Sequence, residues 1–281
     1  MMASSSVSPT LGPRYTSSSS ETVAPQNPCT VGGIQALNTV AVEYLDYGQV
    51  EAAATAFSAV MHDLSNCLLA PAPLPPSSKD RMSTREEEDF VQIQAHVSDS
   101  DRSETEPRSL VFDRPFLFQS NLSKMLHEPD LSSQQHKILV ITSLYNLALC
   151  HQLEYMKRLQ KTPSPHHPKV PKTADARLLL QALYYYEQAY SMILANDPSQ
   201  GRPQEISISP TNPVLPVLMA LCTNATAACA ELGQVQHIDT WNTRLIEFLH
   251  YRQVDLEEDV EKMFTLNAFL HHFPIHAAKA A

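Results

Sequence analysis

The sequence predicts an all-α fold built from helical hairpins, and three observations lead to that prediction. Glycine is scarce, with 6 among 281 residues, so few tight turns are available for a β-sheet protein. Apolar residues recur at spacings of three and four over long stretches, which is typical of amphipathic helices. The 21 prolines gather mainly outside those stretches, which indicates that they mark the connections between helices.

Length and charge narrow the class of protein. The chain is long enough for one large domain or two small ones. Its net charge of −10 repels phosphate, so neither nucleic acid nor an anionic membrane surface is expected as a partner. The sequence has no run of about 18 apolar residues that would span a membrane, and its Ser-rich start lacks the apolar core of a secretory signal. We expect an intracellular protein, cytoplasmic or nuclear, with its five cysteines reduced; import into an organelle is disfavoured.

The first hairpin is predicted over residues 31–70, after a disordered tail of residues 1–30 that is rich in Ser, Thr and Pro. One apolar stripe ends at Gly48 and a second begins directly after it, which predicts two helices joined by a short turn. The stripes consist of Leu37, Val40, Ala41 and Tyr44 before the glycine, and of Val50, Ala53, Phe57, Val60 and Leu64 after it.

A long insert separates this hairpin from the other helices. Residues 71–108 are acidic and proline-rich, and we expect them to be disordered, although residues 90–97 alternate apolar and polar as a strand or a transiently ordered motif does. Residues 109–118, SLVFDRPFLF, are rich in β-formers, and Pro115 restricts them to an edge strand or an extended strap within residues 109–130. Such a segment is prone to aggregation when exposed, so we expect it to lie against the helices.

Two more hairpins and a capping helix are predicted over residues 131–273. The first pair comprises a long helix over residues 130–161 and a helix over residues 173–195, with an exposed proline-rich loop, residues 162–172, inserted between them.

The second pair comprises helices over residues 216–232 and 237–253, with Gly233 as the stop signal between them. A C-terminal capping helix is predicted over residues 255–273, because acidic residues suit its first turn and Pro274 follows its last. Residues 274–281 are then a frayed tail.

The first hairpin places small residues where its helices cross, with aromatic residues beside them. Its pattern is formed, in order, by Ala41, Tyr44, Gly48, Ala53 and Phe57. This order resembles the tetratricopeptide repeat, a helix–turn–helix unit of about 34 residues. Residues 144–189 and 222–245 repeat it in more degenerate form, with Asn242 where an aromatic residue is usual. The layout, with its long inserts, is also similar to tetratricopeptide-like proteins of single-celled algae, and the resemblance implies a short solenoid but no particular activity.

In the resembled family, stacked hairpins form a concave groove lined by the first helix of each pair. Members present an asparagine there to a peptide backbone, because an amide both donates and accepts. Asn146 and Asn224 each lie two residues before the small packing position, where the alternative is an exposed asparagine that bonds only water. No basic residue occupies the positions that clamp a C-terminal carboxylate in the family, so a neutral to apolar groove is expected. The partner-binding candidates are Asn38, Val42, Leu45, Tyr145, Asn146, Leu149, Thr223, Asn224 and Ala227.

No motif in the sequence indicates catalysis or cofactor binding, since GxxxxGK[ST], GxGxxG, HExxH and GxSxG are all missing. The neighbouring His271 and His272 project about 100° apart on a helix, a poor spacing for one metal ion. We therefore expect no enzyme, cofactor or metal, and a non-enzymatic scaffold that binds a partner peptide or helix in the groove. The alternatives are a helical bundle whose acidic and proline-rich loops act as phosphorylation-regulated docking motifs, and an enzyme with an unrecognised site. The sequence leaves the oligomeric state open.

Overall fold

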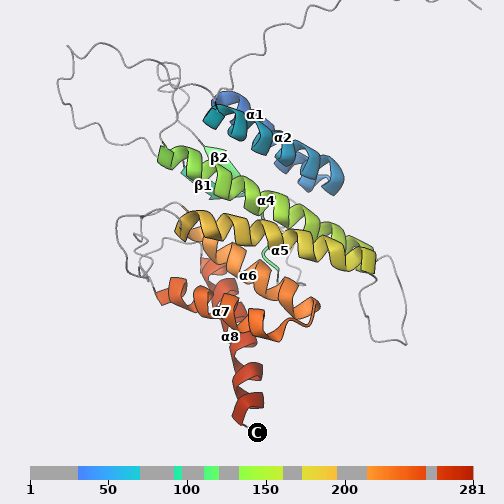
Figure 1. Ribbon diagram of the computed structural model, residues 1–281, viewed down its shortest axis with the longest axis vertical. Coiled ribbons are helices and arrows are strands. Elements are labelled where there is room, and N and C mark those ends of the chain that lie inside the picture. Colours follow the sequence, from blue (N-terminus) through green and yellow to red (C-terminus); the bar gives the residue numbers. More distant parts are fainter. Residues whose placement is uncertain are drawn as a thin grey trace, which may run out of the picture.

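The computed structural model describes residues 31–69, 92–96, 111–119, 133–160, 173–194, 214–250 and 258–280, and the predictions for the tail, most of the insert and loop 162–172 lie outside these residues. The described part is mostly helical, as the sequence predicted, and helices that are adjacent in the sequence are paired (Figure 1). The helices are α1 (Val31–Asp46), α2 (Val50–Leu69), α4 (Ser133–Gln160), α5 (Thr173–Leu194), α6 (Leu215–Glu231), α7 (Val235–His250) and α8 (Glu258–Ala280).

Helices α1 and α2 form the predicted first hairpin. Gly48 adopts φ +66°, a left-handed conformation that glycine tolerates well, and its amide donates to the Leu45 carbonyl at 2.8 Å. Ala41, Ala53 and Phe57 are fully buried in one apolar cluster. The small residues therefore lie inside the hairpin and Phe57 fills the space beside them, as the repeat pattern predicted.

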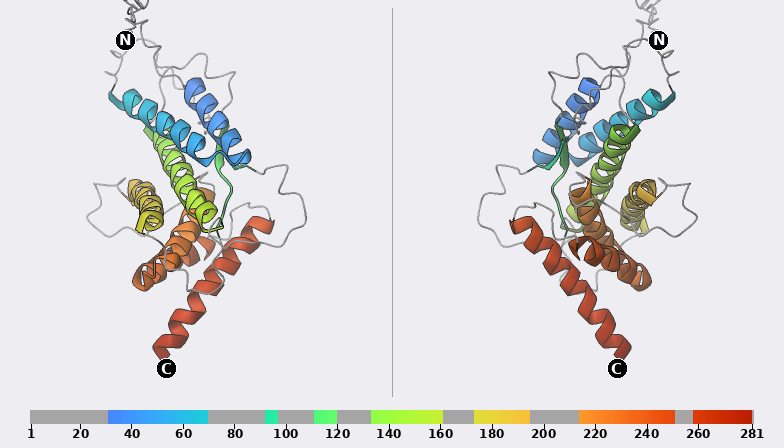
Figure 2. Two further views of the ribbon diagram at one scale, coloured as in Figure 1. Left: turned by 90° about the vertical axis from the view of Figure 1, so that its right-hand side faces the viewer. Right: turned by 90° about the vertical axis from the view of Figure 1, so that its left-hand side faces the viewer.

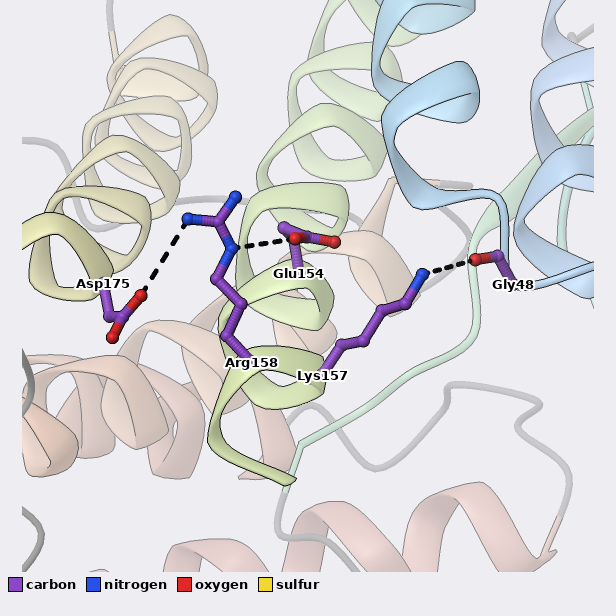
Figure 3. Close-up of polar contacts among 5 residues, drawn as sticks. All are labelled: Gly48, Glu154, Lys157, Arg158 and Asp175. Carbon is purple, nitrogen blue, oxygen red and sulfur yellow. Dashed lines mark hydrogen bonds and ion pairs between the residues drawn. The ribbon is translucent and has the colours of Figure 1, made fainter. Parts of the chain in front are cut away.

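Helix α4 lies between the first hairpin and α5, and polar contacts at its C-terminal end tie it to both (Figure 3). The Lys157 ammonium donates to the Gly48 carbonyl at 3.1 Å, in the turn between α1 and α2. The Arg158 guanidinium donates to Glu154 at 2.8 Å and lies 3.9 Å from the Asp175 carboxylate in the first turn of α5. Surface ion pairs such as these each contribute about 0–1 kcal/mol, so they set orientation more than stability.

Helices α6 and α7 form the last hairpin, and Gly233 ends α6 with φ +68°. Asn242 of α7 is buried, and its amide donates to the Ala268 carbonyl of α8 at 3.1 Å. The residue that departs from the repeat pattern therefore joins this hairpin to the last helix.

Helix α8 runs to Ala280, so the predicted end before Pro274 and the predicted frayed tail were wrong. Proline lacks an N–H, but its fixed φ is helical, so the chain keeps a helical path with one hydrogen bond missing. The end of α8 extends past the other helices (Figure 1). None of the helices in the described ranges has the length and apolar character needed to cross a membrane.

The two strands form a small antiparallel sheet of β1 (Gln92–Ala95) and β2 (Phe116–Gln119). Ala95 pairs with Phe116, and the amide of His96 donates to the Pro115 carbonyl at 2.8 Å. The His96 ring lies 2.7 Å from the Asp46 carboxylate, which joins β1 to the end of α1. The predicted edge strand is confirmed for residues 116–119, which form β2, whereas residues 111–115 belong to no strand.

Candidate functional site

The segment of residues 111–119, called the strap below, lies across the first helices of the three hairpins, α1, α4 and α6. In Figure 2 it is the thin green ribbon that passes α4 on its way between α1 and α8. Its hydrogen bonds join residues 30, 80 and 112 positions apart in the sequence. The expectation that this segment lies against the helices is therefore confirmed. We call the surface that it covers the strap site.

Three phenylalanines anchor the strap in the main apolar core. Phe112, Phe116 and Phe118 expose only 2%, 1% and 2% of their surface. The Phe112 ring lies 5.3 Å from Phe264 of α8, and the Phe116 ring meets Tyr145 of α4 edge-on at 5.2 Å between centroids. Buried aromatic pairs at such distances add about 0.5–1.5 kcal/mol to the free energy of area burial, so the rings fix the position of the strap along the helices.

Asn146 of α4 holds the middle of the strap by two hydrogen bonds. The Phe116 amide donates to Asn146 Oδ1 at 2.9 Å, and Asn146 Nδ2 donates back to the Phe116 carbonyl at 2.8 Å. Both atoms of the side-chain amide are therefore used, on one residue of the strap, and the asparagine is fully buried.

Asn224 of α6 makes the same paired contact with Phe112, at 2.7 Å from the Phe112 amide to Oδ1 and 2.9 Å from Nδ2 to the Phe112 carbonyl. Asn38 of α1 bridges two residues, because it accepts from the Phe118 amide at 3.2 Å and donates to the Phe116 carbonyl at 3.4 Å. Each first helix therefore supplies one buried asparagine to the strap main chain. We call these three residues the clamp.

The clamp takes the place of a missing strand beside β2. In an antiparallel pair, successive residues alternately point their main-chain groups toward the partner strand and away from it. The Pro115 carbonyl faces β1, where it accepts from His96, so the main-chain groups of Phe116 face the opposite way, toward Asn146. The side-chain amides thus satisfy the edge of β2 that lacks a strand. A buried strand edge without such partners would be strongly destabilised.

A buried polar network holds the clamp residue of α6 in place. Asn224 Nδ2 also lies within 3.2 Å of the Tyr145 hydroxyl and 3.3 Å of the Tyr186 hydroxyl. Tyr186 donates to Gln152 Oε1 at 2.9 Å, and Gln152 Nε2 donates to the Asn224 carbonyl at 3.2 Å. Tyr145 donates to the Phe112 carbonyl at 3.1 Å, so it reads the main chain of the strap together with Asn224.

Burial keeps the two tyrosines of this network neutral. Desolvation raises the pKa of Tyr145 well above its ordinary value, with the nearby Tyr186 and Asp113 adding to the shift. Desolvation likewise raises the pKa of Tyr186, and Asn224 opposes part of that shift. Both hydroxyls therefore remain hydrogen-bond donors at any physiological pH.

The sequence matches no protein-family model, no curated protein and no solved structure. The chemistry of the site is therefore inferred from its own residues. These supply amides that match main-chain groups and aromatic walls that match apolar side chains. Within the described ranges, no three His, Cys, Asp or Glu residues gather as a metal site would require.

The nine partner-binding candidates fall into two groups in the structure. Four of them, Asn38, Tyr145, Asn146 and Asn224, hydrogen-bond to the main chain of the strap. The other five lie in the apolar core: Leu149 and Ala227 belong to the large cluster that also holds the three phenylalanines, Val42 and Leu45 belong to the cluster that Leu117 packs against, and Thr223 is buried with no partner for its hydroxyl. Four of the nine candidates thus contact a segment of the same chain.

Gln152, Phe264 and His96 are the contributors that sequence reasoning missed. Gln152 interrupts an otherwise apolar face of α4, and this buried polar residue was the available signal for it. Phe264 and His96 carried no signal, because their partners lie far away in the sequence.

Three cysteine side chains of the described helices are shielded from solvent. Cys150, Cys222 and Cys229 are buried and free. Desolvation raises the pKa of Cys150 and Cys222, and raises that of Cys229 to about 12. Because the thiolate is the reactive form, these three side chains act as small apolar core residues.

Proposed function

We propose that this chain is a non-enzymatic interaction scaffold that binds an extended peptide segment at the strap site, through the main chain of that segment. The observation that carries the proposal is the clamp. Its three asparagines come from three different helices, and each bonds to the strap through main-chain atoms. A side-chain amide carries the same donor and acceptor as a peptide group, so it holds extended chain of many sequences.

The placement of the clamp supports a tetratricopeptide-like arrangement as part of this proposal. One asparagine per hairpin, always on the first helix, is what a stacked repeat with a single inner face would supply. The strap site is then the concave groove of a short solenoid.

The occupied site sets a condition on binding, because an external peptide must compete with a segment of the same chain. A tethered segment competes at an effective concentration of about millimolar for a short flexible connection. An external peptide of equal quality therefore binds the intact chain weakly. Weakening the contacts of the strap should therefore raise the measured affinity of the site for an external peptide.

A strap-loosened full chain tests the proposal. Phe118→Ser removes one anchor from the strap and leaves every helix unchanged. A fluorescent peptide with the sequence of residues 109–120 should bind this folded variant saturably, as measured by anisotropy. Adding Asn146→Ala to Phe118→Ser should abolish binding, whereas adding Gln181→Ala, an exposed amide on α5, should not. If Asn146→Ala left peptide binding unchanged, or if the folded variant bound no peptide, the strap site would be an intramolecular packing contact and not a binding site.

A further inference from the structure

We propose that the ligand of the strap site is an extended segment with aromatic side chains at positions n, n+4 and n+6, and that this ligand displaces the strap, which carries the same pattern. This inference rests on the proposed function and adds the class of peptide. The strap supplies the pattern directly, through Phe112, Phe116 and Phe118.

The spacing follows from the burial of all three rings and from the ring contacts of the first two. The Phe112 ring stacks against Phe116 at 5.8 Å between centroids and lies against Phe264, while Phe116 and Tyr145 meet in a T-shaped arrangement. The clamp reads main chain and therefore contributes little to the choice of sequence. Selectivity must come from the buried rings, because each aromatic residue placed there removes a large apolar area from water.

The three positions between the first two rings do not require apolar residues. Asp113 at n+1 is exposed and Arg114 at n+2 is half-buried, so charged residues are tolerated at both. Pro115 at n+3 accepts from His96 through its carbonyl, and proline retains that carbonyl although it lacks an amide proton. The class of ligand is therefore aromatic–x–x–(x or Pro)–aromatic–x–aromatic.

The direction in which the ligand chain runs across the helices is fixed as well. Position n meets Asn224 of α6, n+4 meets Asn146 of α4, and n+6 meets Asn38 of α1. Since the spacing of four residues precedes the spacing of two, a reversed chain cannot satisfy both. The Asn38 contacts, at 3.2 and 3.4 Å, are longer than the 2.7–2.9 Å contacts of the other two asparagines.

Two peptides of equal composition test the spacing on the full chain. One has the sequence of residues 109–120, and in the other the second and third aromatic residues are each moved by one position. Because side chains of an extended chain alternate between faces, the move turns two rings away from the core. We expect the matched peptide to bind the Phe118→Ser chain roughly tenfold or more tightly than the shifted peptide.

Two controls test whether peptide binding depends on displacement of the strap. Leu117→Ser changes a partly exposed residue of the same segment and should enhance binding far less than Phe118→Ser does. In the wild-type chain, excess matched peptide should speed hydrogen exchange at the amides of Phe112, Phe116 and Phe118, which also decides the matter if Phe118→Ser fails to fold.

The outcomes separate the two proposals. Tighter binding of the matched peptide, with faster exchange in the strap, supports the ligand class. Equal binding of both peptides overturns the ligand class and leaves main-chain binding by the clamp intact. Absence of binding to the folded variant overturns both proposals, and if that variant does not fold, unchanged exchange in the wild-type chain overturns both.

Discussion

Removing the amide of Asn146 is the most direct test of the clamp. In Asn146→Ala, the Phe116 carbonyl keeps one donor, Asn38 at 3.4 Å, but the Phe116 amide loses its acceptor inside the core. A buried donor left without a partner costs about 1–3 kcal/mol, and the lost bonds contribute about 1 kcal/mol more. We therefore expect the free energy of unfolding to fall by about 2–4 kcal/mol.

Thermal unfolding followed by circular dichroism measures this loss. For a domain of this size, about 1 kcal/mol shifts Tm by roughly 2–4 °C, so the expected decrease is about 5–15 °C. Gln181→Ala is the matched control, since it removes an amide of similar size from the exposed face of α5 and should leave Tm nearly unchanged.

An Asn146→Ala chain as stable as the Gln181→Ala control would refute the reasoning, because it would mean that the strap does not depend on the amide of α4. A double variant sharpens the test. Asn146→Ala combined with Asn224→Ala should destabilise by less than the sum of the single changes if either substitution alone already frees the strap.

Three further predictions concern the rest of the core. Phe57→Ala should lower the free energy of unfolding by about 3–5 kcal/mol in a thermal melt, because Phe57 is fully buried in the first hairpin; an unchanged Tm would contradict this packing. Cys150, Cys222 and Cys229 should resist a thiol reagent in the native chain and react after denaturation, as read by peptide mass spectrometry; rapid native labelling would show that this core opens. Burial lowers the pKa of His136 below its ordinary value of about 6.5, so as the pH falls the unfolded chain binds a proton at this histidine before the folded chain does. The contribution of neutral His136 to stability is therefore complete above about pH 6.5 and is lost at lower pH. His136→Gln should reduce the drop in Tm between about pH 7 and 5, and an equal drop in the variant would show that other groups cause it.

The local features of the fold were predictable because they depend on neighbours in the sequence. The turn at Gly48 and the buried pair of Ala41 and Ala53 follow from spacing along two short helices. Asn146 and Asn224 were identifiable from their place before the small packing residue. Asn38 lies three residues before Ala41, whereas Asn146 and Asn224 lie two residues before their small packing residue. The hydrogen bonds of Asn38 to the strap are also the longer ones, at 3.2 and 3.4 Å.

The occupant of the site could not be predicted in the same way. The sequence showed that residues 109–118 needed cover and that the asparagines suited a peptide main chain, but these were two separate expectations. That the asparagines bind this same segment depends on contacts between residues up to 112 positions apart, which no local sequence pattern encodes. The continuation of α8 beyond Pro274 is a different case, because a proline leaves one hydrogen bond unmade and the rest of the helix decides whether it continues.

The bond between Phe112 and Asn224 also governs the order in which the chain can fold during synthesis. The strap is made before α4, whereas the residue of α6 that holds its first phenylalanine is made 112 residues later. At about 5–20 residues per second, that interval is roughly 6–20 s. Throughout it, the partner of Phe112 on α6 does not yet exist, and the phenylalanines of the strap must be shielded by the first hairpin, by α4 or by a chaperone. Ribosome-bound chains stalled before residue 224 should therefore expose these phenylalanines more than the finished protein does.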